Sequence, residues 1–294
     1  MFHLGAHCGC NPNIPFDEFV ASSYEFGWTC FQIFFGPSSD IINRRRLTKE
    51  ESLKTKEICE MTGFKVYTHF PYKIVLVKSG IALKGLQSEL DSLSAFGGRI
   101  VIHPNSPAVK EGPKNCQADD PDCIDDYVEQ YKTAIKIMMI NLKKLDLKGD
   151  APLLLEPPAG EGQKVGWSFD QMKYIAKLIK KNKLNVGFCI DTCHAFAAGL
   201  SRFDTKKAVD RFWKKLDDIG VLDLVKCIHL NDSREPYKSM MDRHESLCRG
   251  LIWKDKEEGF MSMILKCKEL NIDIICETDG ADGVNLCKLI LEED

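Results

Sequence analysis

Long apolar runs are missing from this chain of 294 residues, since no stretch approaches the ~18–20 residues of a membrane-spanning helix. The N-terminus carries neither the basic region nor the apolar region of a secretory signal, so we expect an intracellular protein that does not associate with membranes. No large excess of one charge is present either, because the formal net charge is −3 at pH 7. A content of 44% hydrophobic and 28% charged residues excludes disordered, collagen-like and coiled-coil chains.

Cysteine, in contrast, is abundant, with 13 residues. Many lie inside apolar segments, where a free thiol behaves as a small hydrophobic side chain. Without a secretory signal, this count favours free thiols in a reducing compartment. Cys8 and Cys10 are close enough for a thiolate clip or a disulfide, but no second pair completes a zinc knuckle, and we interpret them as loop thiols.

Short apolar segments recur at intervals of roughly thirty to forty residues, with amphipathic stretches between them. They lack strict alternation, which is typical of strands buried on both faces. The predicted strands are Phe2–His7, Cys30–Phe35, Lys65–His69, Arg99–His103, Pro152–Glu156, Val186–Asp191, Val225–His229 and Asp273–Glu277. The predicted helices are Phe16–Phe26, Lys49–Met61, Ile81–Phe96, Ile124–Leu145, Phe169–Lys181, Lys206–Ile219, Lys256–Leu270 and about Ala281–Leu291.

Eight strands that alternate with eight helices predict an α/β fold, a (β/α)8 TIM barrel that forms a single domain over residues 1–294. The alternative is a doubly wound open sheet, but the first strand is not followed by a Gly-rich nucleotide loop. The polar stretch Asn105–Asp122, with its prolines and acidic residues, predicts a long surface loop after the fourth strand.

Six of the predicted strands end on a side chain that can bind a metal: His69, His103, Glu156, Asp191, His229 and Glu277. The first strand also ends on a histidine, His7. Because barrel active sites lie at the C-terminal ends of the strands, we expect these side chains to converge. Each one alone is explained as a hydrogen-bonded core histidine or a capping carboxylate. A buried ring of carboxylates repels itself, however, unless cations are bound, and the mixture with imidazoles favours zinc, manganese or iron.

Two local clusters extend this ring. His194 follows Asp191 by three residues, and Asp242 and His244 lie two residues apart. Alternate residues of an extended loop point the same way, so Asp242 and His244 can share one ion. The alternative for this Asp-Arg-His segment is an exposed, salt-bridged loop. With the ring, the pool of five histidines and four carboxylates suffices for two or three ions.

Several segments resemble the signature of the endonuclease IV family of apurinic/apyrimidinic endonucleases. They are Gly187–Gly199 (GFCIDTCHAFAAG), His229–Ser233 (HLNDS) and Asp242–His244 (DRH), and the resemblance extends from Gly5 to Thr278. It implies a trinuclear zinc barrel that acts in base excision repair. The enzyme would cleave duplex DNA on the 5′ side of abasic sites and leave a 3′-hydroxyl. Its partner would be duplex DNA with an abasic site, and we expect a monomer.

The resemblance also implies roles for individual residues. It divides nine ligands among three zinc ions: His69, His103 and Glu156 for the first; Glu156 as a bridge, with Asp191, His229 and Glu277, for the second; and His194, Asp242 and His244 for the third. Glu156 and Glu277 would be the catalytic carboxylates. His7 would contact the ligands without binding a metal ion itself.

For DNA binding, the resemblance matches Tyr72 to a family tyrosine that probes the stacked bases beside the lesion. Further rim cations are candidates for phosphate contacts: Lys73, Arg234, Lys238, Arg243 and Arg249. The chain departs from the family pattern at three places. The segment after His69 lacks an asparagine, Gly36–Asp40 lacks an arginine that bacterial members insert beside the lesion, and Cys248 replaces a glycine. These departures bear on lesion preference and touch no predicted ligand.

Two other functions are consistent with parts of this pattern. A two-metal sugar isomerase or epimerase barrel uses the same strand-end ligands, but has no use for Asp242–His244. A DNA-damage-binding protein that does not cut is the second alternative, but such a protein has no chemical need for every ligand. The number of bound zinc ions distinguishes the first alternative, and a nicking assay distinguishes the second.

Overall fold

Eight parallel strands form a closed barrel in the computed structural model, which describes the chain except residues 37–44, 72–75, 77–80, 105–120, 162–163 and 294. Around the barrel the order is β1, β10, β7, β6, β5, β4, β3 and β2, and β2 pairs with β1 to close it. The strands are β1 (Leu4–His7), β2 (Cys30–Ile33), β3 (Lys65–His69), β4 (Arg99–Ile102), β5 (Leu153–Leu155), β6 (Val186–Asp191), β7 (Val225–Leu230) and β10 (Asp273–Cys276). The predicted TIM-barrel fold is confirmed.

The strands are buried on both faces, which explains why their sequences do not alternate. All six residues of β6 are buried, for example. Inside the barrel, small and apolar side chains from different strands form one cluster, which includes Cys30, Val101 and Leu154. β1 and β2 approach closely because Gly5 has no side chain; a Cβ there would lie 1.8 Å from the carbonyl oxygen of Cys30.

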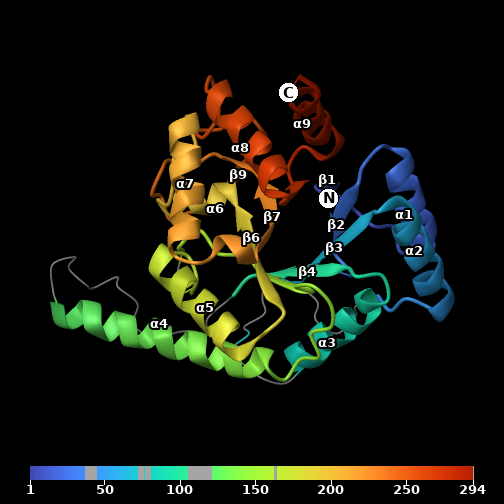
Figure 1. The fold of residues 1–294 in the computed structure, drawn as a ribbon, viewed down its shortest axis with the longest axis horizontal. Helices are drawn as coiled ribbons and strands as arrows, with labels where there is room; N and C mark the ends of the chain where they lie inside the picture. Colours follow the sequence, from blue (N-terminus) through green and yellow to red (C-terminus); the bar gives the residue numbers. More distant parts are fainter. Residues whose placement is uncertain (37–44, 72–75, 77–80, 105–120, 162–163, 294) are drawn as a thin grey trace.

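Helices surround the strands (Figure 1). They are α1 (Phe16–Glu25), α2 (Lys49–Thr62), α3 (Ile81–Ser94), α4 (Pro121–Leu142), α5 (Phe169–Asn182), α7 (Lys206–Asp218), α8 (Glu257–Leu270) and α9 (Gly280–Glu293). α7 shows the sequence logic clearly, because Val209, Phe212 and Leu216 recur at helical spacing and are all buried. None of the described helices combines the length and the apolar character needed to cross a membrane.

Four short elements were not predicted from the sequence. They are α6 (Thr192–Ala197), the 3-10 helix Leu222–Leu224 and a small antiparallel pair of β8 (Asp232–Ser233) and β9 (His244–Glu245). The predicted loop Asn105–Asp122 is wrong at its end, because α4 already begins at Pro121, a residue well suited to the first turn of a helix. Residues 105–120 of that prediction lie outside the described residues.

A polar network closes the N-terminal end of the barrel. The buried carboxylate of Asp273, the first residue of β10, accepts hydrogen bonds from the Tyr67 hydroxyl and from the Lys65 Nζ at 3.0 Å. Its Oδ1 accepts from the backbone N–H of His3 at 3.0 Å, and the Arg99 guanidinium lies 3.6 Å from Oδ2. At this end of the barrel the buried carboxylate is therefore paired with side chains of the protein itself, which indicates a structural role.

Candidate metal centre

The nine residues predicted as metal ligands come together at the C-terminal ends of the strands. They form three groups whose potential ligand atoms all lie within 4.8 Å of one another inside each group. We call these the first cluster (His69, His103, Glu156), the central cluster (Glu156, Asp191, His229, Glu277) and the outer cluster (His194, Asp242, His244). A further group of Asp191, Cys193 and His244 overlaps the last two. The geometry thus reproduces the three ligand sets that the sequence resemblance implies.

In the first cluster, Glu156 follows β5 and is almost completely buried, at 1% exposure. Its Oε2 lies 3.0 Å from Nε2 of His69 and 3.3 Å from Nε2 of His103. Nδ1 of His69 donates to the backbone carbonyl of Phe70 at 2.9 Å, because a carbonyl can only accept. In the neutral ring, the Nε2 lone pair therefore faces the carboxylate, and this contact requires a proton or a metal cation between the two atoms.

In the central cluster, Nδ1 of His229 lies 2.9 Å from Oε1 of Glu156 and 3.4 Å from Oε1 of Glu277. Its other nitrogen, Nε2, donates to the side-chain carbonyl of Gln32 at 2.9 Å. The lone pair of Nδ1 consequently points between two carboxylates. Asp191 ends β6, beside His229 in the strand pairing, which brings its carboxylate to the same place.

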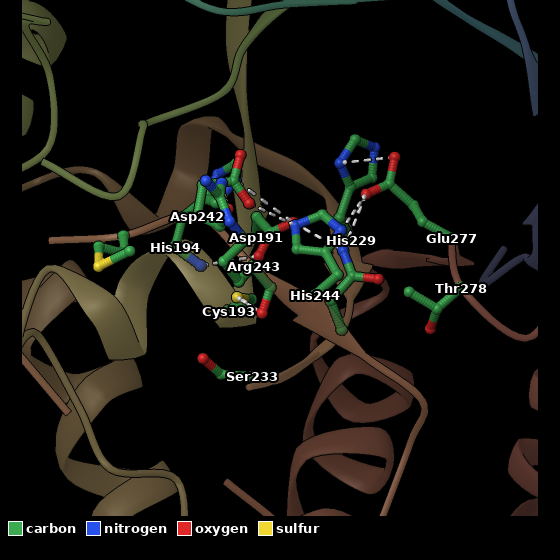
Figure 2. A network of polar contacts seen from close by, with 12 residues as sticks. Asp191, Cys193, His194, His229, Ser233, Asp242, Arg243, His244, Glu277 and Thr278 are labelled. Carbon is green, nitrogen blue, oxygen red and sulfur yellow. Dashed lines mark hydrogen bonds and ion pairs between the residues drawn. The ribbon is translucent and has the colours of Figure 1, made fainter. Parts of the chain in front are cut away.

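The outer cluster is built by two short elements. Asp191 caps α6, where its Oδ1 accepts from the backbone N–H of His194 at 2.8 Å. Nδ1 of His194 donates to the carbonyl of Pro157 at 3.1 Å, and this orients Nε2 toward Asp242. The β8–β9 hairpin presents the other two residues, so that Nε2 of His194 and of His244 lie 3.2 and 3.1 Å from the Asp242 carboxylate. Figure 2 shows these three side chains facing one another.

Charges in the metal-free protein depend on one another. Burial lowers the pKa of His229, but the carboxylates of Glu277 and Glu156 raise it to about 10. Burial raises the pKa of Glu277, but His229 lowers it to about 2. Burial likewise works against ionisation of Glu156, and the imidazoles of His103 and His229 nevertheless hold its pKa well below the ordinary value. Glu156 and Glu277 are therefore ionised in the metal-free protein, and the proton on His229 occupies a position where a cation would bind.

The residues present fit zinc. Two ligands ~2.1 Å from a tetrahedral ion lie roughly 3.4 Å apart, and the ligand atoms described above approach each other to 2.9–3.4 Å. Neither Nε2 of His194 nor Nε2 of His244 makes a hydrogen bond of normal geometry, although both are buried. Imidazole and carboxylate together are the donor set that zinc and related transition metals prefer.

Two amides in the centre were missed by the sequence analysis. Nε2 of Gln32, on β2, donates to Oε1 of Glu277 at 2.9 Å, and Nδ2 of Asn231 donates to Oε2 of Glu277 at 2.8 Å. Nδ1 of His7 lies 2.9 Å from Nε2 of Gln32, so the structure places His7 beside this amide, 3.9 Å from Glu277. Burial lowers the pKa of His7 to about 4, which keeps the ring neutral and able to accept. A polar residue inside a buried strand was the available signal for Gln32.

The predicted DNA-binding residues have different outcomes. Tyr72 and Lys73 lie outside the described residues. Arg234 and Arg243 are exposed on the β8–β9 hairpin. Arg234 forms an ion pair with Glu245 at 3.1 Å, and Arg243 donates to the carbonyl of Asp242 at 2.6 Å.

Two of the predicted departures from the family pattern have different outcomes. Residues 37–40 of the Gly36–Asp40 loop lie outside the described residues. Cys248, where the resemblance leads us to expect a glycine, adopts a left-handed backbone with φ of 60°. A side chain at such a position is strained relative to glycine.

Comparison with known proteins gives consistent relationships. The pattern of a family described as a xylose isomerase-like TIM barrel matches residues 20–286. A protein named probable endonuclease 4 from Aster yellows witches'-broom phytoplasma (strain AYWB) is 28% identical over 260 residues, which cover 86% of this chain and 82% of that protein. The crystal structure of endonuclease IV from Thermus thermophilus superposes with a TM-score of 0.75 at 25% identity, and covers 99% of this chain and 100% of that one. A D-tagatose 3-epimerase-like protein shares the fold, with a TM-score of 0.60 at 14% identity over 99% of this chain and 96% of that one.

Proposed function

This chain belongs to the endonuclease IV family of xylose isomerase-like TIM barrels, and from that premise we propose that it is a zinc-dependent DNA repair endonuclease. Its substrate would be duplex DNA with an abasic site, in which it hydrolyses the phosphodiester on the 5′ side and leaves a 3′-hydroxyl. We further propose that it acts as a single-domain monomer in a reducing compartment, which suits the free thiols of all the described cysteines.

The observation that carries the proposal is the presence of three complete ligand clusters in one centre. A sugar isomerase or epimerase would need the first and central clusters alone. The outer cluster depends on additional structure: the N-cap of α6, the β8–β9 hairpin and a third set of histidine and carboxylate side chains. Because the outer cluster has all three candidate ligands, it supports a substrate that carries negative charge, such as a phosphodiester, rather than a sugar.

Zinc bound at the three clusters would supply Lewis acidity, which a phosphodiester needs around its oxygens and which yields a nucleophile from water at neutral pH. The chain's own residues would hold this charge in place. Glu156 belongs to the first and central clusters, so it would fix their separation. Glu277, with its pKa of about 2, stays ionised at neutral pH and therefore serves as a ligand or base rather than as a proton donor.

Net charge does not oppose a DNA substrate. Three zinc ions would move the formal charge from −3 to about +3. Lys238, in the segment between β8 and β9, and Arg249, shortly after β9, are exposed and add positive charge. Binding to phosphates depends on such local cations and on salt, so we expect affinity for DNA to fall as salt rises.

Cleavage of a duplex with one tetrahydrofuran abasic analogue tests the proposal. We expect a single nick on the 5′ side, loss of nicking with a chelator, and recovery when zinc is restored. Extension of the product by a DNA polymerase would demonstrate the 3′-hydroxyl. A fully zinc-loaded protein that binds this duplex without nicking it would instead support the damage-binding alternative, and a protein saturated by two ions would support the sugar isomerase.

A further inference from the structure

We propose that Gln32 and Asn231 are positioning residues that set the zinc affinity of the central cluster separately from that of the first and outer clusters. This inference rests on the proposed function, because it assigns these amides a role toward the metal ions of that site. Both side chains are fully buried. Neither is a histidine or a carboxylate, yet both donate a hydrogen bond to the carboxylate of Glu277.

All the polar atoms of the Gln32 amide contact residues in or beside the central cluster. Its carbonyl oxygen accepts from Nε2 of His229 at 2.9 Å, which fixes the tautomer that leaves Nδ1 facing the carboxylates. Its two N–H groups point to Oε1 of Glu277 and to Nδ1 of His7, each at 2.9 Å. One side chain therefore orients a histidine and a carboxylate of the same cluster.

Asn231 approaches the cluster from the end of β7. Its Nδ2 donates to Oδ2 of Asp191 at 2.7 Å and to Oε2 of Glu277 at 2.8 Å. Its backbone is fixed in turn by the Thr192 hydroxyl, which accepts from the N–H of Asn231 at 2.9 Å and donates to its carbonyl at 2.7 Å. Both oxygens of Glu277 thus receive an amide donor, one from each side, and this limits rotation of the carboxylate.

The other clusters use a different kind of anchor. The rings of His69 and His194 donate to the backbone carbonyls of Phe70 and Pro157, which no side-chain substitution removes. A change at Gln32 therefore disturbs the orientation of His229 and Glu277 and leaves these two anchors in place. Partners that orient metal ligands typically contribute 10–100-fold to metal affinity.

A chelator titration of the zinc-loaded protein without DNA tests this inference. Gln32→Met removes the amide and keeps an unbranched side chain, and Asn231→Ala removes the second amide independently. The matched control is Gln171→Leu, which alters a buried glutamine on α5 whose carbonyl oxygen accepts from the N–H of Gly166. We expect one zinc ion per chain to leave Gln32→Met at a roughly 10–100-fold lower chelator concentration, while the other two leave as in the wild type. Asn231→Ala should weaken the same ion.

Cobalt substitution supplies a readout that a purely structural effect would not change. Because the absorption of bound cobalt(II) depends on ligand geometry, Gln32→Met should alter the bands of one ion in three, and Gln171→Leu should leave all of them unchanged. Release of all three ions at wild-type chelator concentrations from both amide variants would overturn the inference, as would equal weakening by Gln171→Leu. A wild-type protein that holds no zinc would instead refute the proposed function itself. If Gln32→Met does not fold, the release curve of Asn231→Ala decides.

Discussion

Substitution of Glu156 by glutamine should abolish cleavage and leave the barrel folded. The carboxylate of this buried residue lies within 3.0 Å of His69, 2.9 Å of His229 and 3.3 Å of His103, so it faces ligands of two clusters at once. The amide has nearly the same shape, but it carries no charge and bridges metal ions poorly. If the change removes about 4 kcal/mol of transition-state stabilisation, nicking falls roughly a thousandfold.

The assay follows nicking of the tetrahydrofuran duplex together with zinc content and melting temperature. Asp273→Asn is the matched control, because it also neutralises a buried carboxylate among cations, at the opposite end of the barrel. The control should lose stability and keep its zinc and its nicking activity. Glu156→Gln protein that retains more than about a few per cent of wild-type nicking, with unchanged metal content, would refute the assigned role of the carboxylate as a bridge.

Other expectations follow from the same centre and its rim. Elemental analysis of fully loaded protein should give three zinc ions per chain, and two or fewer would revive the isomerase alternative. Zinc affinity should rise with pH, because the metal-free pKa values of about 10 for His229 and about 9 for His244 mean that zinc displaces protons at neutral pH; calorimetry in buffers of different ionisation enthalpy measures that release. Cys248→Gly should raise the free energy of unfolding by about 1 kcal/mol in a denaturant titration, since it relieves a left-handed residue, and no change would argue against strain there. Tyr72→Ala should weaken binding of abasic DNA roughly ten- to a hundredfold at one stated salt concentration, through loss of base stacking, with zinc content unchanged; lower stability with unchanged affinity would make it a packing residue instead.

The sequence was most informative where two strong patterns coincide. Buried strands without alternation define the barrel, and a histidine or carboxylate at the end of a strand falls at the face where barrel sites form. Glu156 and Asp191 were predictable for this reason, although the ligand role of each stays a prediction. α6 was missed, but it carried a signal as well: Asp191 is an N-cap residue placed directly before a short helical turn.

The amides were not predictable in the same way. Gln32 is the third residue of a four-residue buried strand, and periodicity alone does not tell which face it occupies. Asn231 lies one residue beyond the end of β7, within the segment His229–Ser233, in which only His229 was predicted as a site residue. The contacts of Gln32 depend on which strands meet across the barrel, because Gln32 lies on β2 whereas its partners His229 and Glu277 lie on β7 and directly after β10. Local patterns do not contain that information.

The two ends of the barrel explain why loss of the Glu156 carboxylate should leave the fold intact. At the N-terminal end, Asp273 meets Lys65, Tyr67 and Arg99, so that its buried charge is paired by the chain itself. At the C-terminal end, the four carboxylates of the candidate clusters face five imidazoles, and protons or cations must compensate their charge. Protons can take over that compensation when metal is absent, since His229 and His244 become cationic at neutral pH. The strands between the two ends are held by backbone pairing and by an apolar interior, neither of which involves the side chains of the candidate ligands. Metal removal should consequently change charge and activity at one end while the barrel persists.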